Sequence, residues 1–247
     1  MKKIEVIMGM PITIEIIDAP NEAIFKDVFD YFRYVDEKFS TYKNTSEISA
    51  INRGDILPEQ YSEDMKTVFK LSEQTKTETN NYFDIKKPDG SIDPSGLVKG
   101  WSIHEAAKIL DRAGLINYFI DAGSDIQVRR NEHAEPWSVG IRNPFEQGKI
   151  VKVVFLRNQG MATSGSYARG SHIYNPLKPE QNLNDVVSIS VIGPNVYEAD
   201  RFATAAFAMG KDGIYFIEKL EGFEGYQIDS QGQALATTNF DKYTKNN

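Results

Sequence analysis

Hydrophobic side chains recur with different periods in the two halves of this chain, and this contrast limits the folds that it can adopt. Residues 20–39, 58–79 and 101–113 place apolar side chains at helical spacing. Beyond residue 117, short stretches rich in β-branched and aromatic residues follow one another, with turn residues between them. A helical first half followed by a run of strands favours the α+β class, with a largely antiparallel sheet and flanking helices.

Three local patterns complete the predicted elements. "IEVIMGMPITIEIID" predicts two strands joined at residues 8–10, and Ser46 is placed to cap a short helix that ends near Gly54. "EADRFATAAFAMG", residues 198–210, predicts a buried, alanine-rich helix. The 247 residues contain no internal repeat and no linker, so we expect one domain over residues 1–240. The tail, residues 241–247, is rich in lysine and asparagine and is expected to fray.

Composition argues against several classes of function. The formal net charge is -7 and no basic stripe offsets it, which argues against a general nucleic-acid-binding protein. The chain has no cysteine, so disulfides, thiolate metal sites and a cysteine nucleophile are excluded. No stretch approaches the roughly 18 apolar residues of a membrane span, and the first residues lack the apolar core of a signal peptide. We therefore expect a soluble cytoplasmic protein, although a chain trimmed of an export signal would look the same.

The helix predicted at residues 198–210 carries polar residues within an otherwise apolar stretch. Asp200 and Thr204 lie four residues apart and therefore share one face of a helix. A carboxylate and a hydroxyl that converge on one point are oxygen ligands suited to Mg2+, which keeps waters and takes further ligands from phosphates. The alternative is structural: Asp200 interacts with the helix dipole and Thr204 packs in the core. Taken alone, these two residues favour the structural alternative.

Three other stretches carry candidate ligand-binding residues. In "IDPSGLVKG", Asp93 lies in a turn rich in proline and glycine and Lys99 begins the next helix, a junction at which backbone N–H groups attract anions. A capping turn and a solvated lysine would give the same pattern, and the spacing is not that of a Walker loop. In "DAGSDIQV", Gly123 indicates a bulge or a close backbone approach, and Asp125 either holds a turn or points to a ligand. His172 is the most suggestive of the three histidines, although a lone histidine is more often structural.

Nine segments between residues 8 and 210, taken in order, share one pattern. They are "MGMPITIEI", "FSTYKNTSEISAIN", "FDI", "IDPSGLVKGWSIHEAAKIL", "YFIDAGSDIQV", "PWSVGIRNP", "MATSGSY", "HIYNP" and "ADRFATAAFAMG". Each segment is weak alone, but the ordered set resembles the FAD:protein FMN transferases, also called ApbE-like flavin transferases. The resemblance covers most of the chain.

The resemblance implies an activity and a set of site residues. The family cleaves the pyrophosphate of FAD, transfers FMN to a threonine hydroxyl of a target flavoprotein and releases AMP, with Mg2+ as the required metal ion. Its metal ligands fall on Asp200, Thr204 and the backbone carbonyl of Gly96. Its FAD contacts fall on Met8, Tyr42, Asp93, Lys99 and Ile173. Its histidine before an isoleucine falls on His172, which becomes the candidate general base.

The sequence departs from the family pattern at four places. Ser124 stands where the family usually has the second glycine of Gly-Gly-Asp, and Asn175 stands where it usually has an aspartate before the proline. The segment between residues 84 and 93 is shorter than usual, so some flavin contacts are expected to be missing. Ala203 stands near a position that is acidic in some members. These differences bear on acceptor choice and metal affinity more than on FAD binding.

Two other functions stay open at this point. An FAD pyrophosphatase would use the same metal site and pass FMN to water, and the sequence does not separate it from a transferase. A non-catalytic FAD-binding protein would need no metal ion on the pyrophosphate, so the retained Asp200 and Thr204 argue against it. The expected partners are FAD and a threonine-bearing flavoprotein, with no nucleic acid and no membrane segment.

Overall fold

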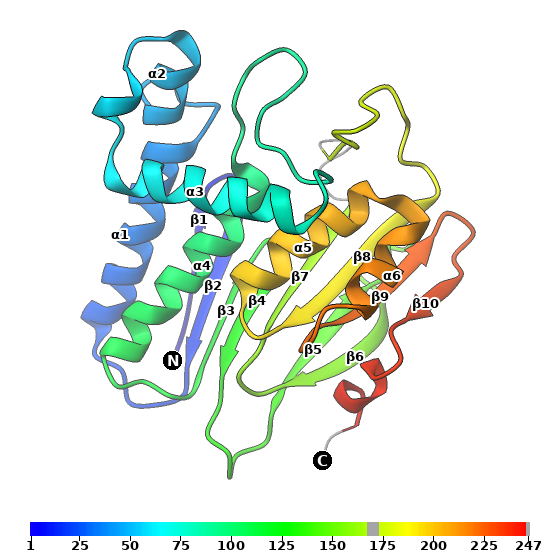
Figure 1. Cartoon of the computed structure of the whole chain (residues 1–247). Helices are drawn as coiled ribbons and strands as arrows, with labels where there is room; N and C mark the ends of the chain where they lie inside the picture. Colours follow the sequence, from blue (N-terminus) through cyan, green and yellow to red (C-terminus); the bar gives the residue numbers. More distant parts are fainter. Residues whose placement is uncertain (167–172, 246–247) are drawn as a thin grey trace.

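The computed structural model describes residues 1–166 and 173–245. Its main feature is an eight-stranded sheet in the order β1-β2-β3-β4-β7-β8-β9-β10, in which all neighbouring strands are antiparallel (Figure 1). These strands are β1 (Lys2–Ile7), β2 (Met10–Ile16), β3 (Tyr118–Ala122), β4 (Asp125–Arg129), β7 (Gly160–Gly165), β8 (Val186–Gly193), β9 (Glu224–Asp229) and β10 (Ala234–Ala236). Helices cover one face of the sheet, which confirms the predicted α+β class.

The sheet begins with the predicted hairpin β1–β2. Met8 and Gly9 form its two-residue turn, with φ angles of 56° and 71°. Such left-handed angles at both turn positions match the right-handed twist of the strands that they join. The alternation in β2 turns Ile12, Ile14 and Ile16 to the covered face, where each side chain is fully buried.

Two long helices, α1 (Glu22–Phe39) and α4 (Ser95–Arg112), pack together over the β1–β3 end of the sheet (Figure 1). The side chain of Asn21 caps α1 by accepting a hydrogen bond from the backbone N–H of Ala23. Phe25, Phe29 and Phe32 recur at helical spacing and fill the core between this helix and the sheet. Two further helices, α2 (Glu47–Arg53) and α3 (Glu63–Glu78), pack with α1 and α4 around a second core cluster.

The other half of the sheet is covered by α5 (Val196–Ala208) and α6 (Gly213–Glu218). Small side chains at Ala199, Ala203 and Ala206 are fully buried, which lets α5 lie close to strands β7 and β8. This confirms the buried, alanine-rich helix. In the described part of the chain, no helix combines the length and the apolar character that crossing a membrane requires.

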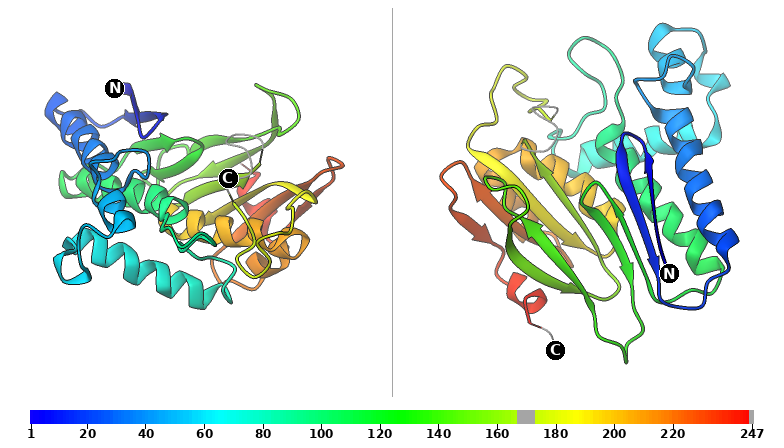
Figure 2. Two further views of the ribbon diagram at one scale, coloured as in Figure 1. Left: turned by 90° about the horizontal axis from the view of Figure 1, so that it is seen from above. Right: turned by 180° about the vertical axis from the view of Figure 1, so that it is seen from behind.

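A separate hairpin lies on the opposite face of the large sheet (Figure 2). It consists of β5 (Trp137–Arg142) and β6 (Ile150–Leu156), and its buried residues pack against Ile126 of β4 and Met161 of β7. Phe240 closes the same cluster from a short 3-10 helix, η3 (Phe240–Tyr243), which extends into the segment expected to fray.

The element boundaries differ from the sequence prediction at three places. The helix expected at residues 58–79 divides into a 3-10 turn, η1 (Pro58–Gln60), and α3, because Ser62 caps the second part. The helix expected at residues 101–113 begins six residues earlier, at Ser95. Gly123, expected at a bulge or a close backbone approach, lies instead with Ser124 in the turn of the β3–β4 hairpin, where both residues have positive φ.

The close contact between β7 and the start of α5 can be tested by a substitution at Gly160. A Cβ atom added at this position would lie 1.9 Å from the backbone nitrogen of Val196. Backbone atoms cannot move aside as a side chain does, so we expect Gly160→Ala to destabilise the fold by about 3 kcal/mol. Gly140→Ala is the matched control, because there the nearest atom is the end of the half-exposed Ile150 side chain. Urea unfolding of both variants measures the difference, and equal midpoints would contradict the contact.

Candidate active site

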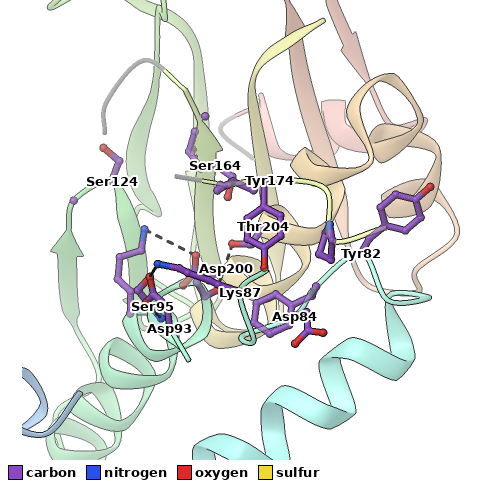
Figure 3. A pocket seen from close by; sticks show the side chains of 18 residues that line it. Tyr82, Asp84, Lys87, Asp93, Ser95, Ser124, Ser164, Tyr174, Asp200 and Thr204 are labelled. Carbon is purple, nitrogen blue, oxygen red and sulfur yellow. Dashed lines mark hydrogen bonds and ion pairs between the residues drawn. The ribbon is translucent and has the colours of Figure 1, made fainter. Parts of the chain in front are cut away.

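A cleft opens where the beginning of α4, the β3–β4 turn, strand β7 and helix α5 meet (Figure 3). It is open to solvent. The residues that line it are Tyr82, Phe83, Asp84, Lys87, Asp93, Ser95, Gly96, Lys99, Gly123, Ser124, Thr163, Ser164, Gly165, Ile173, Tyr174, Pro176, Asp200 and Thr204. Segments that are distant in the sequence therefore contribute to one cavity.

The three expected metal ligands gather at the contact between α4 and α5. The Thr204 hydroxyl donates a hydrogen bond of 3.3 Å to the carbonyl oxygen of Gly96. One turn away, the backbone N–H of Gly100 donates to Asp200 Oδ2 at 2.8 Å. Asp200 and Thr204 thus use one face of α5, as their spacing predicts. Gly96 lies inside the first turn of α4 and not in a preceding loop, which corrects the sequence prediction.

Lys99 lies between two buried carboxylates. Its Nζ is 2.6 Å from Asp125 Oδ2 and 3.9 Å from Asp200 Oδ1. Asp125 is fully buried and Asp200 is 3% exposed. Burial raises the pKa of Asp200, the neighbouring Asp125 charge raises it further, and Lys99 and the Gly100 N–H only partly oppose them. Among the described residues, one ammonium group thus faces two carboxylates, an arrangement that suits an additional cation.

The chemistry of the donor set suits Mg2+. The available groups are the Asp200 carboxylate, the Thr204 hydroxyl and the Gly96 carbonyl, so every donor is an oxygen atom. Within residues 1–166 and 173–245, no three His, Cys, Asp or Glu side chains form a metal-binding group. A set of only three protein ligands suits an ion such as Mg2+, which keeps several waters and completes its coordination shell with phosphate oxygens.

Asp93 lines the cleft just ahead of α4. Its carboxylate forms an ion pair of 2.6 Å with Lys87 and accepts a hydrogen bond of 3.1 Å from the Ser95 backbone N–H. Burial opposes ionisation, but these hydrogen bonds hold the pKa of Asp93 below its usual value. Asp93 is therefore a charged hydrogen-bond acceptor at the cleft wall.

The short segment after residue 84 is held by specific hydrogen bonds. The side-chain amide of Asn52 pairs with both backbone groups of Ile92, at 2.9 Å and 2.7 Å. The Tyr174 hydroxyl donates to the carbonyl of Lys86 at 3.2 Å. Tyr174 thereby links this segment to the one that follows residue 172, and both segments line the cleft.

The remaining candidates divide into three groups. Ile173 lines the cleft, as do Asp93 and Lys99. Met8 lies in the β1–β2 turn, packed against two core clusters, and Tyr42 is 96% exposed; neither lines the cleft. His172 lies outside the described residues.

Sequence reasoning did not select several residues that face the cleft. Lys87 and Tyr174 line it although neither was a candidate, and the hydroxyl-rich strand β7 contributes Thr163 and Ser164. The sequence allows Asp125 either to hold a turn or to point to a ligand. Its ion pair with Lys99 becomes apparent only when β4 and α4 are placed together. The clustering of hydroxyl groups in "MATSGSY" was the available signal for the strand residues.

The crowding of negative charge makes stability depend on pH when no metal ion is present. The folded-state pKa of Asp200 lies above the unfolded value, so this group contributes stability at low pH that is lost as the pH rises through the folded-state pKa. We therefore expect Asp200→Asn to be more stable than the parent chain at pH 7 in EDTA, with a smaller difference at pH 4. Glu132→Gln, an exposed carboxylate, is the control. Thermal unfolding at both pH values tests this, and a less stable Asp200→Asn at pH 7 would contradict it.

The ApbE family model matches residues 8–87 and 85–226 of the chain. The FAD:protein FMN transferase of Escherichia coli K12 is 28% identical over 166 residues, which cover 63% of this chain and 47% of that protein. The Vibrio cholerae enzyme of the same name is 30% identical over 135 residues, covering 51% of this chain and 40% of that protein. The chain thus spans about half the length, or less, of these curated relatives.

Solved structures show the same fold. The ApbE protein of Thermotoga maritima superposes with a TM-score of 0.85 at 18% identity, covering 99% of each chain. The flavin transferase ApbE of Vibrio cholerae gives 0.83 at 20% identity, covering 98% of each chain. Since the family model extends over most of the sequence, the chain belongs to the ApbE family.

Proposed function

We propose that this protein is a Mg2+-dependent FAD:protein FMN transferase that moves FMN from FAD to a threonine hydroxyl of a target flavoprotein. The observation that carries the proposal is the meeting of Gly96, Asp200 and Thr204 beside Lys99 at one end of the cleft. Oxygen ligands and an ammonium group at one point suit a pyrophosphate with its metal ion. The names of the curated relatives support the same activity.

The proposed reaction is a substitution at the FMN-side phosphorus of FAD. The threonine oxygen forms a bond to this phosphorus, the bond to the bridging oxygen breaks, and AMP leaves with that oxygen. The threonine proton passes to His172, our proposed general base. Mg2+ bound by Gly96, Asp200 and Thr204 would neutralise charge on the pyrophosphate. No residue becomes covalently modified in this scheme.

The other side chains bind and orient FAD. Lys99 supplies positive charge next to the metal ligands, and the first turn of α4 adds the partial positive charge of a helix N-terminus. Asp93, held ionised by Lys87, would accept hydrogen bonds from a flavin or adenine ring. We assign Met8, Tyr42 and Ile173 to apolar contacts with FAD. Met8 and Tyr42 do not line the cleft, so their assignment rests on the family pattern.

FAD hydrolysis is the competing activity, because the same residues would direct water to the same phosphorus. The two activities differ in the acceptor alone, so AMP release without an acceptor protein measures hydrolysis. A non-catalytic FAD-binding role is less favoured, because storage gives no reason for oxygen ligands to gather beside a lysine.

Metal binding is tested by Thr204→Val, which keeps the side-chain shape but removes the hydroxyl. We expect the Mg2+ concentration for half-maximal transfer to rise about tenfold or more, since one ligand is lost, whereas FAD affinity without Mg2+ stays unchanged. Thr67→Val, on the exposed face of α3, is the control. Transfer is followed as covalent flavin fluorescence of the acceptor in a denaturing gel. An unchanged Mg2+ dependence would remove Thr204 from the metal site.

The general base is tested by His172→Ala. We expect the transfer rate to fall by roughly 10²–10⁴-fold with little change in FAD affinity, because the histidine acts on the proton of the acceptor. His133→Ala, in an exposed turn, is the control. If FAD affinity and folding collapse together with the rate, the histidine has a structural role and the assignment is wrong.

A further inference from the structure

A second groove adjoins the active-site cleft. It is lined by residues of the β5–β6 hairpin and of strands β3, β4 and β7 of the large sheet. Ser124, in the β3–β4 turn, and Thr163, on β7, line both the cleft and the groove. The two cavities therefore share these residues as part of their walls.

Short contacts connect this junction to the proposed reaction centre. The backbone N–H of Thr163 donates to Asp125 Oδ1 at 3.3 Å. The other oxygen of Asp125 is 2.6 Å from Lys99 Nζ, and Lys99 in turn lies 3.9 Å from Asp200. Asp125 and Lys99 thus connect Thr163, on the wall that the two cavities share, to the proposed metal ligand Asp200.

One wall of the groove follows the edge of β5. Ser138 and Gly140 are exposed on one face of this strand and Val139 is buried on the other, yet all three line the groove. The groove is thus lined by three consecutive residues of β5 and lies along this strand. β5 pairs with β6 alone in the described part of the chain, so this edge has N–H and C=O groups free of a strand partner. Such an edge accepts an extended peptide as an additional strand.

The rim of the groove offers apolar contacts and one charge. Ile150 and Val153 of β6 line it with side chains that are 50% and 42% exposed. The side chain of Ile150 lies over Gly140, where an added Cβ would be only 2.7 Å from its terminal carbon. Arg142 contributes an exposed positive charge beside the half-buried Asp121. These features suit a peptide with small or apolar side chains next to its reactive residue.

We propose that this groove binds the segment of the acceptor protein that carries the threonine, in an extended conformation along β5. The proposal rests on the transferase function proposed above, because that reaction needs a second, macromolecular substrate. In this arrangement FAD would occupy the cleft, and the groove would hold the acceptor backbone outside it. The threonine side chain would then pass Ser124 and Thr163, which line both cavities, to reach the phosphorus of FAD.

The test replaces an exposed residue at the rim and leaves the cleft intact. Val153→Glu places a charge at the groove, and Val151→Glu is the matched control, because Val151 is 37% exposed on the same strand but does not line the groove. The probe is an acceptor flavoprotein domain produced without its flavin. We expect the KM for this domain to rise about tenfold in Val153→Glu, with kcat, FAD affinity and FAD hydrolysis unchanged. Val151→Glu should behave like the parent chain.

A photo-crosslinking measurement gives the answer even if Val153→Glu folds poorly. A benzophenone side chain at position 138, on the exposed face of β5, should crosslink to acceptor residues that flank the threonine, and mass spectrometry identifies them. Equal KM values for both valine variants, or crosslinks to residues remote from the threonine, would overturn the groove assignment and leave the transferase function standing. If the parent chain leaves the acceptor threonine unlabelled, the proposed function itself is wrong.

Discussion

The close contact between α4 and α5 at Gly100 is the interaction on which the site depends. A Cβ atom at Gly100 would lie 2.6 Å from the Cβ of Asp200, so only glycine lets the two helices approach this far. At this distance the Gly100 N–H reaches the Asp200 carboxylate, and one turn away Thr204 reaches Gly96. Gly96 and Gly100 on α4 therefore face Thr204 and Asp200 on α5, and each pair is separated by four residues. This register brings the oxygen ligands together without a dedicated loop.

A buried helix can carry these polar residues because each of them has a partner. Asp200 accepts the N–H of Gly100 and lies near Lys99. Its neighbour Arg201, only 4% exposed, donates to Glu198 at 2.8 Å, pairs with Glu78 of α3 and lies over the ring of Phe202. Unpaired charges would be costly at this depth, so the ion pairs that satisfy α5 also fasten α3 to it. Helix α5, which contributes Asp200 and Thr204 to the cleft, is thus joined to α3.

Local patterns in the sequence predicted much of the fold. The alternation around Met8, the spacing of the phenylalanines in α1 and the cap at Ser46 all depend on neighbouring residues, and the structure agrees with them. The start of α4 was missed because Pro94, Gly96 and Gly100 disfavour a helix by propensity, whereas the contact with α5 requires glycine there. The pairing of Asp125 with Lys99 depends on packing between distant segments, which periodicity does not report.

The hydrogen bond between Gly100 and Asp200 joins residues that are 100 positions apart in the chain. During synthesis the amino-terminal half, with β1, β2 and α1 to α4, leaves the ribosome well before α5 does. A nascent chain therefore has Lys99 and Asp125 but lacks two of the oxygen ligands until residues 200–204 have emerged. The proposed Mg2+ and FAD would therefore stabilise only a chain translated beyond that point. Incomplete translation products would then be left to proteolysis without the protection that bound ligands give.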